Sequence, residues 1–156
     1  MKKLMSALLV PLLLVGAAVL VAPTASARTV DLTPRQLTKA GFPRGTANTT
    51  DWGKGTVELP GHRAPALEVQ HITGTAPRRT KPGQVLTMQR FIPTDRQGSG
   101  TFETVEITTT VKSDRIFDLQ FALGRVGRFG YRVGYLTDGA NPEFIGFQFQ
   151  FRTTSS

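Results

Sequence analysis

The residue types that most often carry out chemistry are sparse in this chain of 156 residues. Cysteine is absent, which excludes disulfides, thiolate metal sites and cysteine nucleophiles. The only two histidines are His62, in a Pro-Gly-His-Arg turn, and His71, in a predicted strand. Neither has the neighbouring histidines and carboxylates that a metal site needs. We therefore predict no catalytic residue, no metal ligand and no cofactor.

The 11 acidic side chains are scattered along the chain. Two paired carboxylates could act as acid and base on a glycosidic bond, but Glu106 and Asp118 fall on strand faces that we predict to be wet. Ser99 lies between two glycines at a predicted hairpin tip and lacks the strand-to-helix context of a nucleophile elbow. A carboxylate-based glycoside hydrolase is therefore the least favoured function.

Basic side chains are a more informative set, because 19 Lys and Arg give a formal net charge of +8. Arg78, Arg79 and Lys81 form a small basic loop, and Arg128 and Arg132 fall on the outward side of one predicted strand. A basic face attracts anionic polymers through long-range electrostatics. These five residues are therefore candidate binding residues, and the alternative is an ordinary arginine-rich surface without a ligand.

Trp52 is the only tryptophan and lies in a predicted loop. An exposed indole could stack on a sugar ring, which makes Trp52 a further candidate binding residue. The favoured alternative is that it folds over the end of the domain and covers the core. The other aromatic residues lie in core phase, so they are not free to stack on bases, and we expect no specific nucleic-acid partner.

The first 27 residues have the three parts of a secretory signal peptide in order. Met1-Lys2-Lys3 is a positive start, residues 4–21 are an apolar run, and Ala25-Ser26-Ala27 is a cleavage site. An uncleaved signal anchor is the alternative. After cleavage no apolar stretch remains that could span a bilayer, so we expect a secreted protein, either extracellular or associated with the cell envelope.

Residues 28–55 form a predicted N-terminal extension with one short helix. Thr33-Pro34 is a helix start, with an N-cap hydroxyl before proline at the first helical position. Gly41 suits the left-handed position after a helix end, so the helix should run from about Pro34 to Ala40. Residues 45–55 are rich in Gly, Thr, Asn and Asp and indicate a loop.

Residues 56–156 alternate between apolar and polar side chains, which is typical of strands with one buried face. Antiparallel sheets with one wet face pair up to cover their apolar faces. We therefore predict an all-β fold, an antiparallel β-sandwich, and leave a small barrel open as the alternative. Six or seven strands are expected, near Val57–Leu59, Ala66–Thr73, Val85–Ile92, Val105–Val111, Phe117–Leu123, Phe129–Tyr135 and Ile145–Phe151.

Four segments carry a resemblance to a family: Val85-Leu-Thr-Met-Gln-Arg90, Thr104-Val-Glu-Ile-Thr-Thr-Thr110, 117–123 and Gly127-Arg-Phe-Gly-Tyr-Arg-Val133. Together they resemble exported bacterial, actinobacterial-type immunoglobulin-like or fibronectin-III-like domains. Gly127, Phe129 and Tyr131 fall where the family places a glycine, the corner tyrosine and the second cysteine. The resemblance implies an immunoglobulin-like β-sandwich with a role in binding, adhesion or spacing rather than in catalysis.

These observations favour a secreted, non-catalytic interaction module of the extracellular space or cell envelope. Its expected partner is an anionic wall polymer or another secreted protein. The alternative is a secreted inhibitor or effector that acts on a protein through the loops at the ends of the domain.

Overall fold

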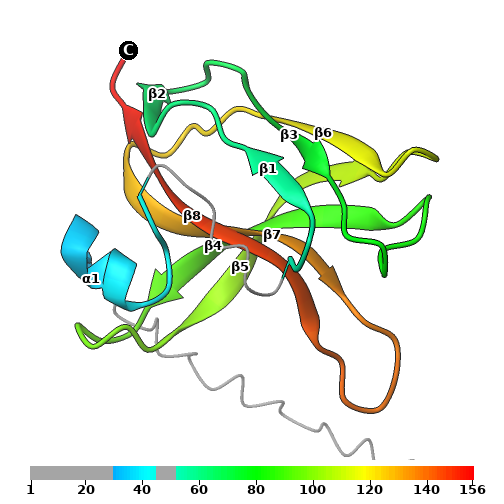
Figure 1. The fold of residues 1–156 in the computed structure, drawn as a ribbon. Coiled ribbons are helices and arrows are strands. Elements are labelled where there is room, and N and C mark those ends of the chain that lie inside the picture. Colours follow the sequence, from blue (N-terminus) through cyan, green and yellow to red (C-terminus); the bar gives the residue numbers. More distant parts are fainter. Residues whose placement is uncertain (1–29, 45–51) are drawn as a thin grey trace, which may run out of the picture.

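The computed structural model describes residues 30–44 and 52–156 (Figure 1). Within these residues the chain is all-β apart from one short helix, α1 (Pro34–Lys39). The predicted signal peptide, residues 1–27, lies outside the described residues, as do residues 45–51 of the predicted loop. In the described part, no helix has the length and apolar character that a bilayer span requires.

The described residues form eight strands in two sheets. One sheet has the order β1-β3-β6 and the other the order β2-β8-β7-β4-β5. All neighbouring strands are antiparallel except β2, which lies parallel to β8. The strands are β1 (Thr56–Glu58), β2 (Arg63–Pro65), β3 (Gln70–Thr75), β4 (Val85–Pro93), β5 (Gly100–Thr110), β6 (Ile116–Phe121), β7 (Gly127–Leu136) and β8 (Phe144–Thr154).

The all-β prediction is confirmed, with two differences in the first half of the domain. β2 was not expected, because three residues that end in a proline carry no alternation signal. β3 begins at Gln70 instead of near Ala66, since Leu67 has a φ of 65°, which breaks the extended backbone. β5 begins at Gly100, five residues before its predicted start, and the other expected strands appear within three residues of their predicted bounds.

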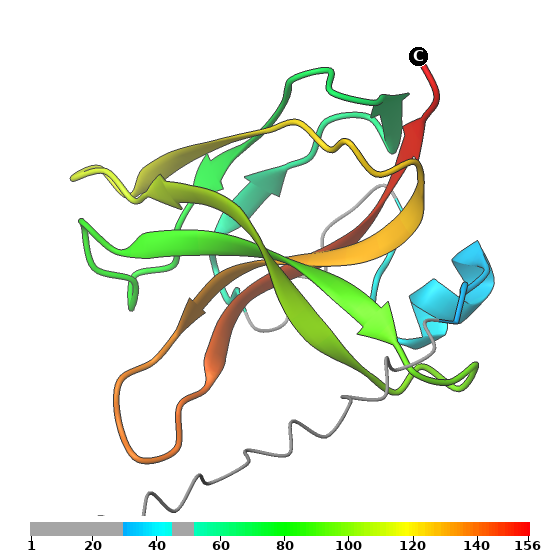
Figure 2. The same cartoon turned by 180° about the vertical axis from the view of Figure 1, so that it is seen from behind.

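One hydrophobic core lies between the two sheets, which cross over each other in Figures 1 and 2. The alternation predicted from the sequence decides which side chains enter it. The three-stranded sheet contributes buried side chains such as Ile72 and Leu119, and the five-stranded sheet contributes Leu86, Val133 and Phe147. Because the inward side chains of β7 and β8 fill this core, their even-numbered neighbours occupy the outer face of the five-stranded sheet.

The α1 helix begins and ends close to the predicted positions. Thr33 is the N-cap and forms a capping box with Gln36, and Pro34 occupies the first turn. Ala40 is the C-cap, and Gly41 follows with a φ of 95°, the left-handed conformation that suits glycine. Such a short helix is not stable alone in water, so its stability must come from packing on the sheet beneath it.

Residues 30–44 pack on the outer face of the five-stranded sheet, which corrects the expectation that this face of β8 is wet. Gln150 is only 1% exposed, and its Nε2 donates to the carbonyl oxygens of Pro34 (2.9 Å) and Phe42 (2.6 Å). Gly130 makes room for the ring of Phe42, because a Cβ there would lie 2.6 Å from that ring. A second apolar cluster around Leu37 and Phe42 joins the extension to β4. Residues 30–44 therefore cover part of this outer face.

Candidate anion-binding site

Strand register places three arginines in a line across neighbouring strands. Arg152 of β8 pairs with Arg63 of β2 on one side and with Arg128 of β7 on the other. Directly paired positions project their side chains from the same face of a sheet, and here it is the outer face, since Phe151 next to Arg152 enters the core. Arg44 lies beside this line, because its backbone bridges to β8 at Gln150, two residues before Arg152 and on the same face of the strand. We call Arg44, Arg63, Arg128 and Arg152 the arginine row.

No carboxylate within the described residues forms an ion pair with the arginine row. The ion pairs Arg90–Glu103 and His71–Asp118 lie elsewhere. The pKa of Arg128 is lowered by partial burial and, in addition, by the positive charges of Arg44 and Arg152. One terminal nitrogen of Arg128 is buried without a hydrogen-bond partner in the described part of the chain. The positive charges of the row are therefore left uncompensated by the described protein groups.

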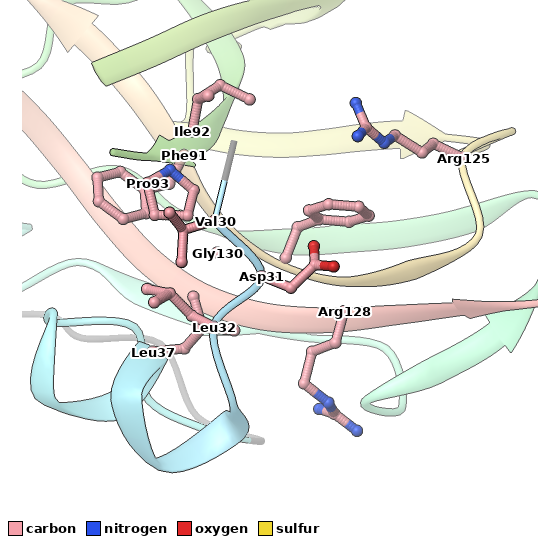
Figure 3. A pocket seen from close by; sticks show the side chains of 11 residues that line it. Val30, Asp31, Leu32, Leu37, Phe91, Ile92, Pro93, Arg125, Arg128 and Gly130 are labelled. Carbon is pink, nitrogen blue, oxygen red and sulfur yellow. The ribbon is translucent and has the colours of Figure 1, made fainter. Parts of the chain in front are cut away.

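Asp31 is the acidic residue that shares a small cavity with Arg128 and Arg125. Figure 3 shows the guanidinium group of Arg128 pointing away from the Asp31 carboxylate. The cavity holds about 10 Å³, which is at the lower limit for a single water molecule. This cavity is therefore part of the packing between the extension and the sheet, and any ligand of the row must lie on the surface.

The chemistry of the row suits anions. When no anion is present, the neighbouring positive charges repel one another, which lowers the stability of the sheet. Like charges directly opposite on neighbouring strands destabilise a sheet. A guanidinium group donates two parallel hydrogen bonds to a carboxylate or a phosphate, so both groups suit this surface. Arginine stays protonated at any physiological pH, so the row can act by electrostatic attraction but not by proton transfer.

Arg132 lies on the outward side of β7, as predicted, but it is not part of the row. Its guanidinium carbon stacks 3.5 Å from the ring centre of Phe102 and 4.0 Å from that of Phe144. Its Nε donates a hydrogen bond of 2.7 Å to Gln89 Oε1, and partial burial lowers its pKa. These contacts fix Arg132 as a cation packed between two aromatic rings.

A shallow groove of about 430 Å³ lies on the outer face away from residues 30–44, over β4, β5 and β7. Gly134 is one of its lining residues, and a Cβ there would lie 2.1 Å from the carbonyl oxygen of Ile145 in β8. Its lining is neutral, so the groove concentrates no charge of its own. The lining residues are Gln84, Val85, Thr87, Gln89, Thr104, Gly134, Tyr135, Leu136 and Phe144.

The predicted basic residues Arg78, Arg79 and Lys81 are exposed in the loop between β3 and β4. Thr80, within this loop, is hydrogen-bonded to the hydroxyl of Tyr135 at 3.2 Å. Tyr135 lies seven residues after Arg128 on the same strand, which is a separation of roughly 23 Å at about 3.3 Å per residue. The basic loop and the arginine row are therefore two separate surfaces at opposite ends of β7.

The prediction that Trp52 could bind a sugar ring is wrong. Trp52 is 0% exposed and contacts Phe117 and Phe147 edge-on, with ring centres 5.7 and 5.4 Å away. Gly55 lies directly against the indole, since a Cβ there would be 2.3 Å from Trp52 Nε1. The indole therefore has no face available to a ligand, and the alternative interpretation, that Trp52 covers the core, is confirmed.

Sequence reasoning found Arg128 but missed Arg44, Arg63 and Arg152. A signal for Arg152 was present, because Arg128 and Arg152 lie equally far from Ala140, the centre of the predicted turn. A hairpin closed at that turn must pair the two arginines. No comparable signal exists for Arg63, because β2 has no periodicity, or for Arg44, because it lies outside every predicted helix and strand.

Comparison with known proteins adds no relative: no protein-family model matches the sequence, and no curated protein matches it. In residues 30–44 and 52–156, histidine, aspartate and glutamate nowhere gather in threes as a metal site would require. The arginine row is therefore the feature of the described surface from which function can best be inferred.

Proposed function

We propose that this protein is a secreted, non-catalytic interaction module that binds an anionic polymer of the cell envelope through the arginine row. The observation that carries the proposal is the alignment of three arginines, with Arg44 beside them, and none of the four has a carboxylate partner among the described residues. Export rests on the signal-peptide pattern of residues 1–27. A charged surface of this kind holds a ligand by many weak contacts and does not need an enclosed pocket.

A polymer fits the row better than a single small anion does. Neighbouring strands lie about 4.8 Å apart, so the three strands that carry Arg63, Arg152 and Arg128 spread their guanidinium groups over roughly 10 Å or more. A chain with regularly repeated phosphate or carboxylate groups can contact several of them at once. Each contact is weak alone, and several on one chain raise the overall affinity.

The proposed scaffold is an immunoglobulin-like β-sandwich, and the strand order supports it. In immunoglobulin domains the strands G, F and C, with C′ in the variable type, face a sheet that contains A, B and E. The order β8-β7-β4-β5 opposite β1-β3-β6 corresponds to that arrangement, with β2 added at the edge next to β8. Tyr131, which matches the position of the family's second cysteine, is 1% exposed in the core.

The proposal predicts salt-sensitive retention of the protein on an immobilised poly(glycerol phosphate). Exposed charges attract each other over about 30 Å at 0.01 M salt but only about 3 Å at 1 M. We expect retention at the lower ionic strength and complete elution at the higher one. Neutral dextran on the same matrix is the control and should retain nothing. Absence of retention at 0.01 M, or equal retention on dextran, would contradict the proposal.

A further inference from the structure

Two loops next to the arginine row carry exposed apolar side chains. Leu67 is 72% exposed in the loop after β2, and Val126 is 56% exposed in the loop before β7. The two loops touch, because the Leu67 N–H donates to the carbonyl of Leu123 at 3.1 Å. Leu67 Cδ2 also lies against Gly124, 3.4 Å from where a Cβ would be. Leu67 and Val126 thus lie in two loops that touch each other, and we call these two exposed side chains the apolar tip.

The apolar tip adjoins the arginine row along the chain and in space. Val126 is two residues before Arg128, and Leu67 is four residues after Arg63. The segment after β2 and the segment that leads into β7 run beside each other at the end of the molecule that carries the C-terminus (Figures 1 and 2). Exposed Arg125 stands directly next to Val126. This end of the protein therefore combines exposed apolar side chains with several positive charges.

The backbone at Leu67 adds a second reason to assign a role to the tip. Leu67 has a φ of 65°, in the left-handed region that a residue with a branched side chain rarely occupies. Glycine or asparagine would adopt this conformation at a lower cost. A strained leucine that exposes most of its side chain gains little from packing within the protein, so its contact is expected outside the chain.

We infer that this end of the protein docks on an anionic lipid bilayer, with the arginine row on the headgroups and the apolar tip in the interfacial region. The inference rests on the proposed function, because the row supplies the charge. Lysines and arginines attract anionic lipid surfaces, and apolar side chains enter the boundary between headgroups and acyl chains. A soluble polyanion gives exposed leucine and valine nothing to bury against, whereas a bilayer does.

Two features of the apolar tip limit its insertion to the interfacial region of the bilayer. Glu68 follows Leu67, and its carboxylate accepts a hydrogen bond from Gln70 Nε2 at 3.0 Å. A carboxylate next to the tip opposes deep entry into the acyl chains, since burial of a charge is costly. Only a few apolar side chains are exposed here. Docking should therefore be shallow, reversible and dependent on both the charges and the apolar side chains.

The chain offers a matched control for the apolar side chains. Leu136 and Val85 are 57% and 47% exposed, and they flank the groove at the end of β7 far from the row. The test variant is Leu67→Ser with Val126→Ser, and the control variant is Leu136→Ser with Val85→Ser. Each removes one leucine and one valine from the surface without changing the net charge.

The test is co-sedimentation with phosphatidylcholine vesicles that contain or lack phosphatidylglycerol, next to retention on immobilised poly(glycerol phosphate). We expect wild type and the control variant to bind only the vesicles with phosphatidylglycerol. The Leu67→Ser/Val126→Ser variant should lose at least 10-fold in vesicle affinity and keep its retention on poly(glycerol phosphate).

Three outcomes would overturn the inference. In the first, wild type is retained on poly(glycerol phosphate) but does not bind the vesicles, which leaves the proposed function intact. In the second, the Leu67→Ser/Val126→Ser variant binds the vesicles as wild type does. In the third, the control variant loses as much vesicle affinity as the test variant, so that the loss of affinity is not specific to the apolar tip. If wild type binds neither poly(glycerol phosphate) nor the vesicles with phosphatidylglycerol, the result contradicts the proposed function itself.

Discussion

Replacing Arg44, Arg63 and Arg152 together with glutamine is expected to weaken binding to poly(glycerol phosphate) by about 100-fold. A basic residue near an anionic surface contributes about 1 kcal/mol, and about 1.4 kcal/mol is a factor of 10 in affinity. The three side chains are exposed, so their loss should leave the fold intact. Arg128 is kept in this variant because it is partly buried. Calorimetric titration at low ionic strength measures the change.

A charge-matched variant distinguishes the contribution of the arginine row to binding from the contribution of the overall net charge. Lys54, Arg96 and Lys112 are also exposed and lie in other loops. Replacing these three with glutamine removes the same charge, and we expect affinity to fall by no more than a few fold. If both variants weaken binding equally, the polymer responds to the overall positive charge of the protein and the row has no special role.

Replacing Trp52 with alanine is expected to lower the free energy of unfolding by about 3–5 kcal/mol, the range for buried tryptophan and phenylalanine. Trp52 is fully buried and contacts aromatic rings of β6 and β8, one from each sheet. Its removal opens a cavity between the sheets that the backbone cannot close without moving a strand. Urea unfolding followed by circular dichroism measures the loss.

Trp52→Phe is the control for this substitution. Phenylalanine keeps an aromatic ring between Phe117 and Phe147 and removes the indole N–H, which is buried without a partner in the described residues. We expect a loss clearly smaller than that of alanine. A Trp52→Ala loss below about 1 kcal/mol is the size of a surface substitution and would show that the indole does not hold the two sheets together.

The fold could be predicted from the sequence where one periodicity governs a segment. In β6 the buried residues Phe117, Leu119 and Phe121 alternate with polar ones, and the structure places them in the core. The helix start at Thr33 could also be predicted, because a capping box is a local interaction. Such signals need only the neighbouring residues and the requirement that apolar side chains leave water.

The packing of residues 30–44 on the outer face of the five-stranded sheet could not be predicted, because it depends on contacts between residues that are distant in the sequence. Gln150 is one of the polar residues that alternate with the core residues of β8, so the sequence pattern predicts a solvent-exposed side chain. It is buried because a segment more than 100 residues earlier packs over it and supplies the carbonyl oxygens that its amide needs. Burial of a polar side chain is tolerated only when such partners exist, and no local pattern reports them.

The candidate site was predictable in part for the same reason. Arg128 and Arg132 share one side of a predicted strand, and this side is confirmed as the outer face. Their environments differ because the neighbouring strands place Phe102 and Phe144 beside Arg132 but further arginines beside Arg128. Two residues with the same phase on the same strand therefore become a packed cation and a member of an open charged row.

The central claim, that the arginine row binds anionic polymers, is tested most directly by nuclear magnetic resonance of the isotope-labelled protein during titration with soluble polyphosphate. The side-chain Nε–Hε signals of Arg44, Arg63, Arg128 and Arg152 should shift together and saturate at one polymer concentration. The signal of Arg132 should change little, since its Nε–H is already bonded to Gln89. Shifts confined to Arg78 and Arg79, or no change at the four arginines at low ionic strength, would contradict the claim.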